Sequence, residues 1–245
     1  TGQLTDFQAA RETADGPGRE HRIILGPWTH VMGVGEVHDY PFSQPGSLIS
    51  YIPHMLEWFD RWLRGKPFPR NWGPVRIYDP GTGEWSDRSA LWAPDGKTVD
   101  LFLHGDQGVA LCRPAGRMTE TPFSDPADIR YTYDPRNPVI RYGGPLLSME
   151  SGCILEEDGC PRPDILTFFS DPLPGDLPLD GELFLELPVS STARDTAFVG
   201  RLALVKPDGK AYFLRQGVTT LSHRNGNAVQ ALYDPGTVVD LRIDM

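Results

Sequence analysis

Basic residues and long apolar runs are both scarce in this sequence. The 245 residues include 23 lysines and arginines against 33 aspartates and glutamates, which gives a formal net charge of −10. This charge repels nucleic-acid phosphates and anionic lipid surfaces, so we expect neither nucleic acid nor a membrane as a partner. No 18 apolar residues run together, and the first residues, TGQLTDFQAARE, lack the basic-then-apolar pattern of a signal peptide. The sequence therefore predicts a cytoplasmic location, with secretion left open as the alternative.

Cysteine is also rare, and the spacing of cysteines and histidines does not match a metal site. The three cysteines, which leave at least one thiol unpaired, are Cys112, Cys153 and Cys160. A bridge between Cys153 and Cys160 would close a small loop but needs an oxidising compartment, so we expect reduced thiols. The acidic run 156–158 is interpreted as a solvated loop, with calcium binding left open. We expect no metal and no cofactor.

The apolar pattern has a helical period up to about residue 65. Apolar residues recur at three- and four-residue steps between Ser50 and Leu63, which predicts an amphipathic helix. Gly65 is placed to end it in a left-handed turn, and the two following prolines prevent continuation. Before it, the pattern predicts a short helix ending ahead of Gly16 and a buried strand over 22–25.

Beyond residue 73 the pattern changes to short alternating strands separated by Gly, Pro and Asp. The expected strands cover 74–78, 99–104, 129–133, 165–170, 181–187, 197–205, 211–214, 218–221 and 238–243. Such a series of antiparallel strands closes most naturally as a two-sheet sandwich of the jelly-roll type. The sequence shows no internal repeat of fixed period, which disfavours a propeller or a solenoid.

His30 is the residue best placed for chemistry. The segment Ile23-Ile-Leu-Gly-Pro-Trp-Thr-His30 predicts a buried strand that runs into a rigid Gly-Pro turn and presents a histidine beyond it. In α/β hydrolases the histidine that acts as general base lies on a loop and comes last in chain order. From the spacing alone, a loop histidine satisfied by hydrogen bonds is the competing interpretation.

Eight short motifs follow one another along the chain. They are Leu25-Gly-Pro-Trp-Thr-His30, Trp58-Phe-Asp-Arg-Trp-Leu-Arg-Gly65, Trp85, Tyr133-Asp-Pro-Arg-Asn-Pro138, Gly143-Gly144, Arg162-Pro-Asp-Ile-Leu166, Asp195-Thr-Ala-Phe198 and Pro207-Asp-Gly209. In order and spacing they resemble the serine-hydrolase superfamily of cocaine esterases, X-Pro dipeptidyl-peptidases and α-amino-acid ester hydrolases. The resemblance covers nearly the whole chain.

The resemblance implies a mainly β chain with two parts. Residues 1–70 would be the tail of an α/β-hydrolase domain, with His30 as the triad histidine. Residues 71–245 would be a jelly-roll β-sandwich of the galactose-binding-like kind, cut short at its C-terminal end. The resemblance also implies that the loop 143–149 lines the acyl pocket through Leu147 and Ser148. An ordinary sandwich loop is the alternative, and Ser148 lacks the strained turn of a nucleophile.

The sequence departs from the family pattern at the catalytic serine. A nucleophile elbow of the G-x-S-x-G type does not occur in the 245 residues. The triad aspartate of the family lies about thirty residues before the histidine, ahead of Thr1. Asp6 is the nearest carboxylate within the chain, and its helical position is typical of a solvated surface group. We therefore expect the chain alone to be inactive.

Two function hypotheses follow. The first is part of a serine hydrolase that cleaves small ester, amide or X-Pro dipeptide substrates through an acyl-enzyme. The alternative is a stand-alone β-sandwich module that binds a carbohydrate or another ligand. A sandwich without its last strands would expose unpaired backbone groups along a sheet edge. We therefore expect a homo-oligomer, or complementation by the missing strands.

Overall fold

The chain is mainly β, as the sequence predicts, with few helices and with sheets that do not close. The computed structural model describes residues 2–13, 20–28, 48–69, 73–92, 96–105, 116–122, 124, 128–140, 143–147, 151–156, 162, 164–226 and 228–245. Two compact units divide the chain. The first consists of Thr1–Pro94, Tyr142–Leu155 and Glu182–Met245, and the second of Asp95–Arg141 and Glu156–Gly181.

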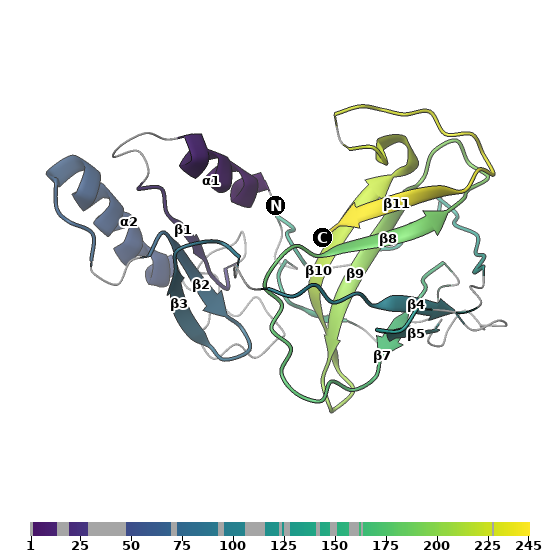
Figure 1. The fold of residues 1–245 in the computed structure, drawn as a ribbon, viewed down its shortest axis with the longest axis horizontal. Coiled ribbons are helices and arrows are strands. Elements are labelled where there is room, and N and C mark those ends of the chain that lie inside the picture. The colour runs from purple at the N-terminus through teal and green to yellow at the C-terminus, as the bar shows by residue number, and fades with distance from the viewer. Residues whose placement is uncertain are drawn as a thin grey trace. The chain divides into compact units, whose positions relative to one another are not determined.

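The N-terminal residues form a small mixed sheet with a crossover helix (Figure 1). The elements are α1 (Gly2–Thr13), β1 (Ile23–Leu25), α2 (Leu48–Arg64), β2 (Val75–Asp79) and β3 (Glu84–Arg88). The strand order is β1-β2-β3, with β1 parallel to β2 and β2 antiparallel to β3. Parallel neighbours cannot be joined by a tight turn, so the chain must cross over between β1 and β2, and the crossover contains α2.

The end of α2 confirms the predicted stop signal. Gly65 has a φ of 68°, the left-handed conformation that residues with a side chain adopt at a cost. Two basic residues, Arg61 and Arg64, lie in the last turn, where their positive charges interact favourably with the negative end of the helix dipole. The amide of Lys66 then donates to the carbonyl of Asp60 at 3.2 Å, which closes the helix end.

The C-terminal residues of the first unit form two sheets over one core. One sheet has the order β6-β10-β9, and the other pairs β11 with β8. The strands are β6 (Leu155–Glu156), β8 (Phe184–Val189), β9 (Ala197–Val205), β10 (Ala211–Thr220) and β11 (Val239–Asp244), with a 3-10 turn, η2 (Leu221–His223), after β10. Leu221, Leu241 and Ile243 are at most 1% exposed and pack with Tyr233 at the centre of this core. Both sheets therefore depend on the same buried cluster.

The second unit contains the sheet β4-β5-β7. Its strands are β4 (Phe102–Gly105), β5 (Gly116–Thr119) and β7 (Phe168–Ser170), with β4 antiparallel and β7 parallel to β5. Gly105 lies against Ile129, because a Cβ added to Gly105 would come within 2.6 Å of the Ile129 Cδ1 atom. Residue 129 therefore packs onto the β4–β5 hairpin.

The strand predicted over 129–133 is wrong. The segment is irregular, although Ile129 packs on the hairpin and Tyr131 and Tyr133 alternate with polar residues. Alternation indicates an extended chain with two faces, but a strand also needs a neighbour with free backbone groups. The prediction for 197–205 is confirmed with the same bounds, and the two runs 211–214 and 218–221 join in the single strand β10.

Within the described part of the chain, neither α-helix has the length and apolar character that a bilayer span requires.

The close approach of β10 to β11 gives a test of this fold. A Cβ at Gly217 would lie 2.1 Å from the carbonyl oxygen of Asp244, a backbone atom that has little room to move. We expect Gly217→Ala to lower the free energy of unfolding by about 2–3 kcal/mol. Urea unfolding followed by far-UV circular dichroism measures the change.

Gly175→Ala is the matched control, because a Cβ there meets no atom within 4 Å. This variant should stay within about 0.5 kcal/mol of the parent. Equal stability of the two variants would contradict the packing of β10 against β11.

Candidate functional site

The exit of β1 is held by Trp28. The chain leaves β1 through Gly26 and Pro27, and the Trp28 ring folds back over Gly26, where an added Cβ would lie 2.4 Å from a ring carbon. Only glycine leaves room for this arrangement. The Trp28 ring meets Tyr51 of α2 edge-on at 6.0 Å and lies 5.7 Å from the ring of Trp85 on β3. The exit is therefore fixed against both the helix and the sheet.

A second layer of contacts supports this aromatic cluster. Tyr78 of β2 is 5% exposed and lies edge-on to Trp85 at 5.3 Å. The guanidinium of Arg76 lies 5.9 Å from the centre of the Trp85 ring, within range of a cation–π attraction. Aromatic pairs of this geometry add stabilisation beyond that of area burial. The cluster of Trp28, Tyr51, Tyr78 and Trp85 thus joins the segment after β1 to α2, β2 and β3.

His30 follows Trp28 by two residues and lies outside the described residues. Trp28, a member of the aromatic cluster, is the last described residue before it. The role of His30 as general base stays a prediction.

The entry to β1 is held by ion pairs rather than by aromatic rings. Arg61 of α2 forms a bidentate pair with Glu20, at 2.6 and 2.8 Å. The hydrogen bond from Arg61 lowers the pKa of the Glu20 carboxyl, and the carboxylate raises the pKa of Arg61 in return. Arg22 donates to the carbonyl of Gly73 and stacks on Phe68 at 3.8 Å. Both ends of this short strand are thereby tied to α2 or to the segment after it.

Helix α2 turns its apolar stripe outward. The side facing Glu20 and Trp28 contains Tyr51, Trp58 and Arg61, which are half-buried. The adjoining side exposes 40–78% of each of the residues Ile52, Met55, Leu56, Phe59, Trp62 and Leu63. In globular domains the apolar stripe of an amphipathic helix faces the core. Sequence periodicity locates the stripe but not the surface that covers it.

Leu147 lies three residues after a backbone bridge between Gly144 and Gly152. Gly144 and Gly152 exchange two backbone hydrogen bonds, of 2.8 and 2.9 Å. Gly144 has a φ of 76° and packs on the ring of Phe213, which a Cβ would approach to 2.9 Å. Leu147 is 78% exposed beyond this bridge. The predicted partner in the pocket, Ser148, lies outside the described residues.

One buried hydroxyl beside the Gly144–Gly152 bridge lacks a hydrogen-bond partner among the described residues. Ser151 is 1% exposed, and its Oγ atom makes no hydrogen bond there. Two residues later, the Sγ atom of Cys153 donates to the carbonyl of Phe213 at 2.8 Å. The other member of the proposed bridge, Cys160, lies outside the described residues, as does Cys112. Among the described residues, no group of three His, Cys, Asp or Glu side chains could hold a metal ion.

Asp195, Ser222 and His223 meet after β10, and sequence reasoning assigned them no site. The Ser222 hydroxyl donates to Asp195 at 2.7 Å and lies 3.1 Å from Nδ1 of His223. Hydrogen bonds from Ser222 lower the pKa of Asp195. In a catalytic triad the histidine stands between the acid and the serine. Here the serine stands between them and is 6% exposed, so the trio is no nucleophile centre.

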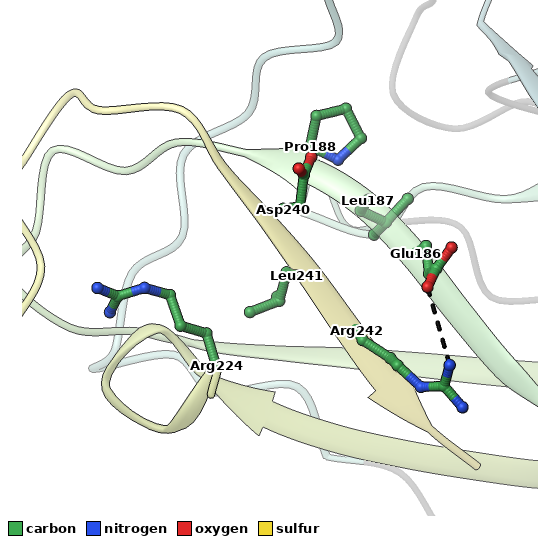
Figure 2. Close-up of a pocket in the computed structure, with 7 residues that line it drawn as sticks. All are labelled: Glu186, Leu187, Pro188, Arg224, Asp240, Leu241 and Arg242. Atoms are coloured by element: carbon green, nitrogen blue, oxygen red, sulfur yellow. Dashed lines mark ion pairs between the residues drawn. The ribbon is translucent and has the colours of Figure 1, made fainter. Parts of the chain in front are cut away.

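A shallow depression of 310 Å³ lies over β8 and β11 (Figure 2). Its lining contains four charged residues, of which Arg242 faces Glu186 at 3.9 Å. Arg242 also donates to Asp244 at 2.8 Å and stacks on Phe184 at 3.8 Å. The guanidinium of Arg224 donates to three backbone carbonyls. The cations of this depression are already engaged within the protein, which disfavours it as an anion site.

The motif Arg162-Pro-Asp connects two segments of the second unit. Arg162 donates to both oxygens of Asp164, at 2.9 and 2.7 Å, and also to the side chain of Asn137 at 3.1 Å. The Asp164 side chain is 4% exposed. The hydrogen bonds from Arg162 hold the pKa of Asp164 below its ordinary value. This motif and the Tyr133–Pro138 motif are therefore joined in space, as structural elements.

Comparisons with known proteins identify the class. Residues 70–245 match the family described as the X-Pro dipeptidyl-peptidase C-terminal non-catalytic domain, and the chain belongs to this family. The cocaine esterase of Rhodococcus sp. (strain MB1 Bresler) is 31% identical over 249 residues, which cover 99% of this chain and 42% of that protein. The chain therefore spans about two fifths of the length of this relative.

Two solved structures share the fold. An aminopeptidase from a marine sediment archaeon, Thaumarchaeota archaeon, matches 91% of this chain and 38% of its own, with a TM-score of 0.70 and 21% identity. A selenomethionine-labelled α-amino acid ester hydrolase matches 91% and 39%, with a TM-score of 0.69 and 20% identity. The resemblance to the C-terminal part of this hydrolase superfamily, predicted from the sequence, is confirmed.

The pair of Arg162 and Asp164 gives a prediction for pH. Because the folded pKa of Asp164 is lowered, the pair stabilises the fold above the unfolded pKa of aspartate, and this contribution is lost as pH falls through the folded pKa. Asp164→Asn should lower the free energy of unfolding at neutral pH by more than the control variant below does, since it removes the carboxylate that accepts two hydrogen bonds from Arg162. It should also flatten the decrease in stability at acid pH. Urea unfolding at several pH values measures both effects.

Asp134→Asn is the control, because Asp134 pairs with an arginine that is 89% exposed. We expect a smaller change than at Asp164, because solvent screens exposed ion pairs. An effect of Asp164→Asn no larger than that of this control would contradict the structural role of the pair.

Proposed function

We propose that the chain is the C-terminal part of a serine hydrolase that cleaves ester or amide bonds, X-Pro dipeptide bonds among them, through an acyl-enzyme. In this proposal residues 1–70 complete an α/β-hydrolase domain, and residues 71–245 form a jelly-roll β-sandwich. The observation that carries it is the 31% identity to cocaine esterase along 99% of the chain. The chain alone is catalytically inactive, because it lacks a G-x-S-x-G elbow.

The unit β1-α2-β2 supports the assignment of residues 1–70. Parallel strands joined through a helix are the repeating unit of α/β domains, in which both faces of the sheet are covered. β1 is an edge strand, and α2 leaves six large apolar side chains exposed. Both features fit a fragment that completes a larger sheet. A nucleophile-bearing hydrolase segment is the natural cover for this surface.

His30 is the general base of the proposed reaction. An imidazole on the loop after a strand can take the proton of a serine hydroxyl and return it to the leaving group. The packing of Trp28 on Gly26, Tyr51 and Trp85 supports this role, since it fixes the start of that loop. The attacking serine comes from outside the chain, and so does the aspartate that orients the imidazole.

Leu147 and Ser148 line the acyl pocket in this proposal. A leucine that is 78% exposed offers an apolar contact to a second surface. The backbone bonds between Gly144 and Gly152 hold the chain three residues before it. If residues 143–149 form an ordinary surface loop instead, Leu147→Ala leaves KM unchanged.

The role of His30 is tested in the full-length polypeptide that contains this chain. His30→Gln should lower kcat by about 10²–10⁴-fold on a p-nitrophenyl ester, with KM little changed, because the base acts in the chemical step. An X-Pro p-nitroanilide, assayed in parallel, separates ester from dipeptide substrates.

His54→Gln is the matched control, the same change on α2, where His54 lies 3.5 Å from Glu57, and should retain the parental kcat. A folded His30→Gln protein with unchanged kcat would rule out His30 as the base and remove the proposed function of residues 1–70.

A further inference from the structure

Four polar side chains form a closed set at the end of β10. Asp195 precedes β9, Thr220 ends β10, and Ser222 and His223 belong to η2. Thr220 Oγ1 lies 2.9 Å from both Ser222 Oγ and His223 Nδ1, and Ser222 Oγ lies 3.1 Å from the same nitrogen. Ser222 Oγ also lies 2.7 Å from Asp195 Oδ2.

The donors in this set can be assigned by counting hydrogens. A carboxylate only accepts, so the contact with Asp195 uses the one hydrogen of the Ser222 hydroxyl. The contact between Thr220 and Ser222 must then use the hydrogen of Thr220. Nothing remains on Thr220 for His223, so the third contact needs a hydrogen on Nδ1 of the ring.

The opposite tautomer satisfies fewer contacts. With Nδ1 unprotonated, Thr220 would donate to the ring, and the 2.9 Å approach of Thr220 to Ser222 would place two oxygen lone pairs together without a hydrogen. The 3.1 Å contact of Ser222 with Nδ1 would lose its hydrogen too. Ser222 is 6% exposed, so water does not readily replace the missing partner.

We propose that a relay from His223 Nδ1–H through Thr220 and Ser222 to Asp195 holds neutral His223 with its lone pair on Nε2. In this tautomer Nδ1 is the donor of the ring and Nε2 its acceptor. The carboxylate acts on the ring through two hydroxyls, whereas in a catalytic triad it acts directly. This inference does not depend on the proposed hydrolase reaction.

The charged groups around the ring agree with this assignment. Asp195 receives a second hydrogen bond, from the amide of Ser222 at 3.0 Å, which fixes the carboxylate as an acceptor. The neighbouring Arg224 directs its guanidinium to the carbonyls of Leu221, Ala231 and Leu232. Among the described residues, the Asp195 carboxylate is therefore the charged group to which hydrogen bonds connect the ring.

Long-range ¹H–¹⁵N NMR of the 245-residue chain tests the proposal. The spectrum is recorded on the basic side of the ring titration, where the shifts no longer change with pH, and His223 is assigned with His223→Gln. We expect a protonated Nδ1 and an unprotonated Nε2. Ser222→Ala frees the hydrogen of the Thr220 hydroxyl, which can then donate to Nδ1, so it should shift the ring towards the Nε2–H form. Thr220→Val keeps the shape of the side chain but removes the hydroxyl, and it should leave Nδ1 protonated, because Ser222 Oγ still accepts at 3.1 Å.

Two controls keep the result unambiguous. Thr219→Val, one residue earlier on the same strand, should leave the His223 signals unchanged, and the amide spectrum reports whether each variant is folded. A predominant Nε2–H form of His223 in the parent chain overturns the proposal. So does a folded Ser222→Ala protein with the parental tautomer.

Discussion

The parallel pairing of β1 with β2 is the constraint on which the N-terminal part of the structure depends. Ile23 pairs with Val75 and Leu25 with Ile77, so the chain between them must cross over, and α2 lies within that crossover. A parallel sheet is stable only when both faces are covered. Here β1 is an edge strand and the apolar stripe of α2 faces outward. This geometry supports our proposal that residues 1–70 complete a larger α/β domain.

The two sheets over the Leu241 core are different, because they bury their own apolar centre. Leu221, Leu241 and Ile243 are at most 1% exposed, and residues of β8 and β9 close over them. This contrast matches the comparison with known families, in which residues 70–245 belong to a non-catalytic domain. In our proposal the general base comes from the N-terminal residues, and the C-terminal residues contribute Leu147 and Ser148 to the acyl pocket. The relay to His223 is a separate feature of the C-terminal residues.

Local signals in the sequence were sufficient for part of this structure. The period of α2, its end at Gly65 and the bounds of β9 follow from nearest neighbours along the chain. The alternation of apolar and polar residues wrongly predicted a strand at 129–133, because this pattern carries no information about a partner strand. Helical periodicity located the apolar stripe of α2, but the side that it covers is decided by tertiary contacts. The relay at His223 joins residues from separate segments, and only Ser222 and His223 are neighbours in sequence. The roles of His30, Leu147 and Ser148 remain predictions.

The central claim is that this chain contributes a base and a scaffold to a reaction whose nucleophile lies elsewhere. A serine-reactive fluorophosphonate probe applied to the purified 245-residue chain, followed by intact-mass measurement, tests that claim most directly. We predict that no serine is modified under conditions in which an active serine esterase is labelled completely. Stoichiometric modification of one serine of this chain would contradict the account.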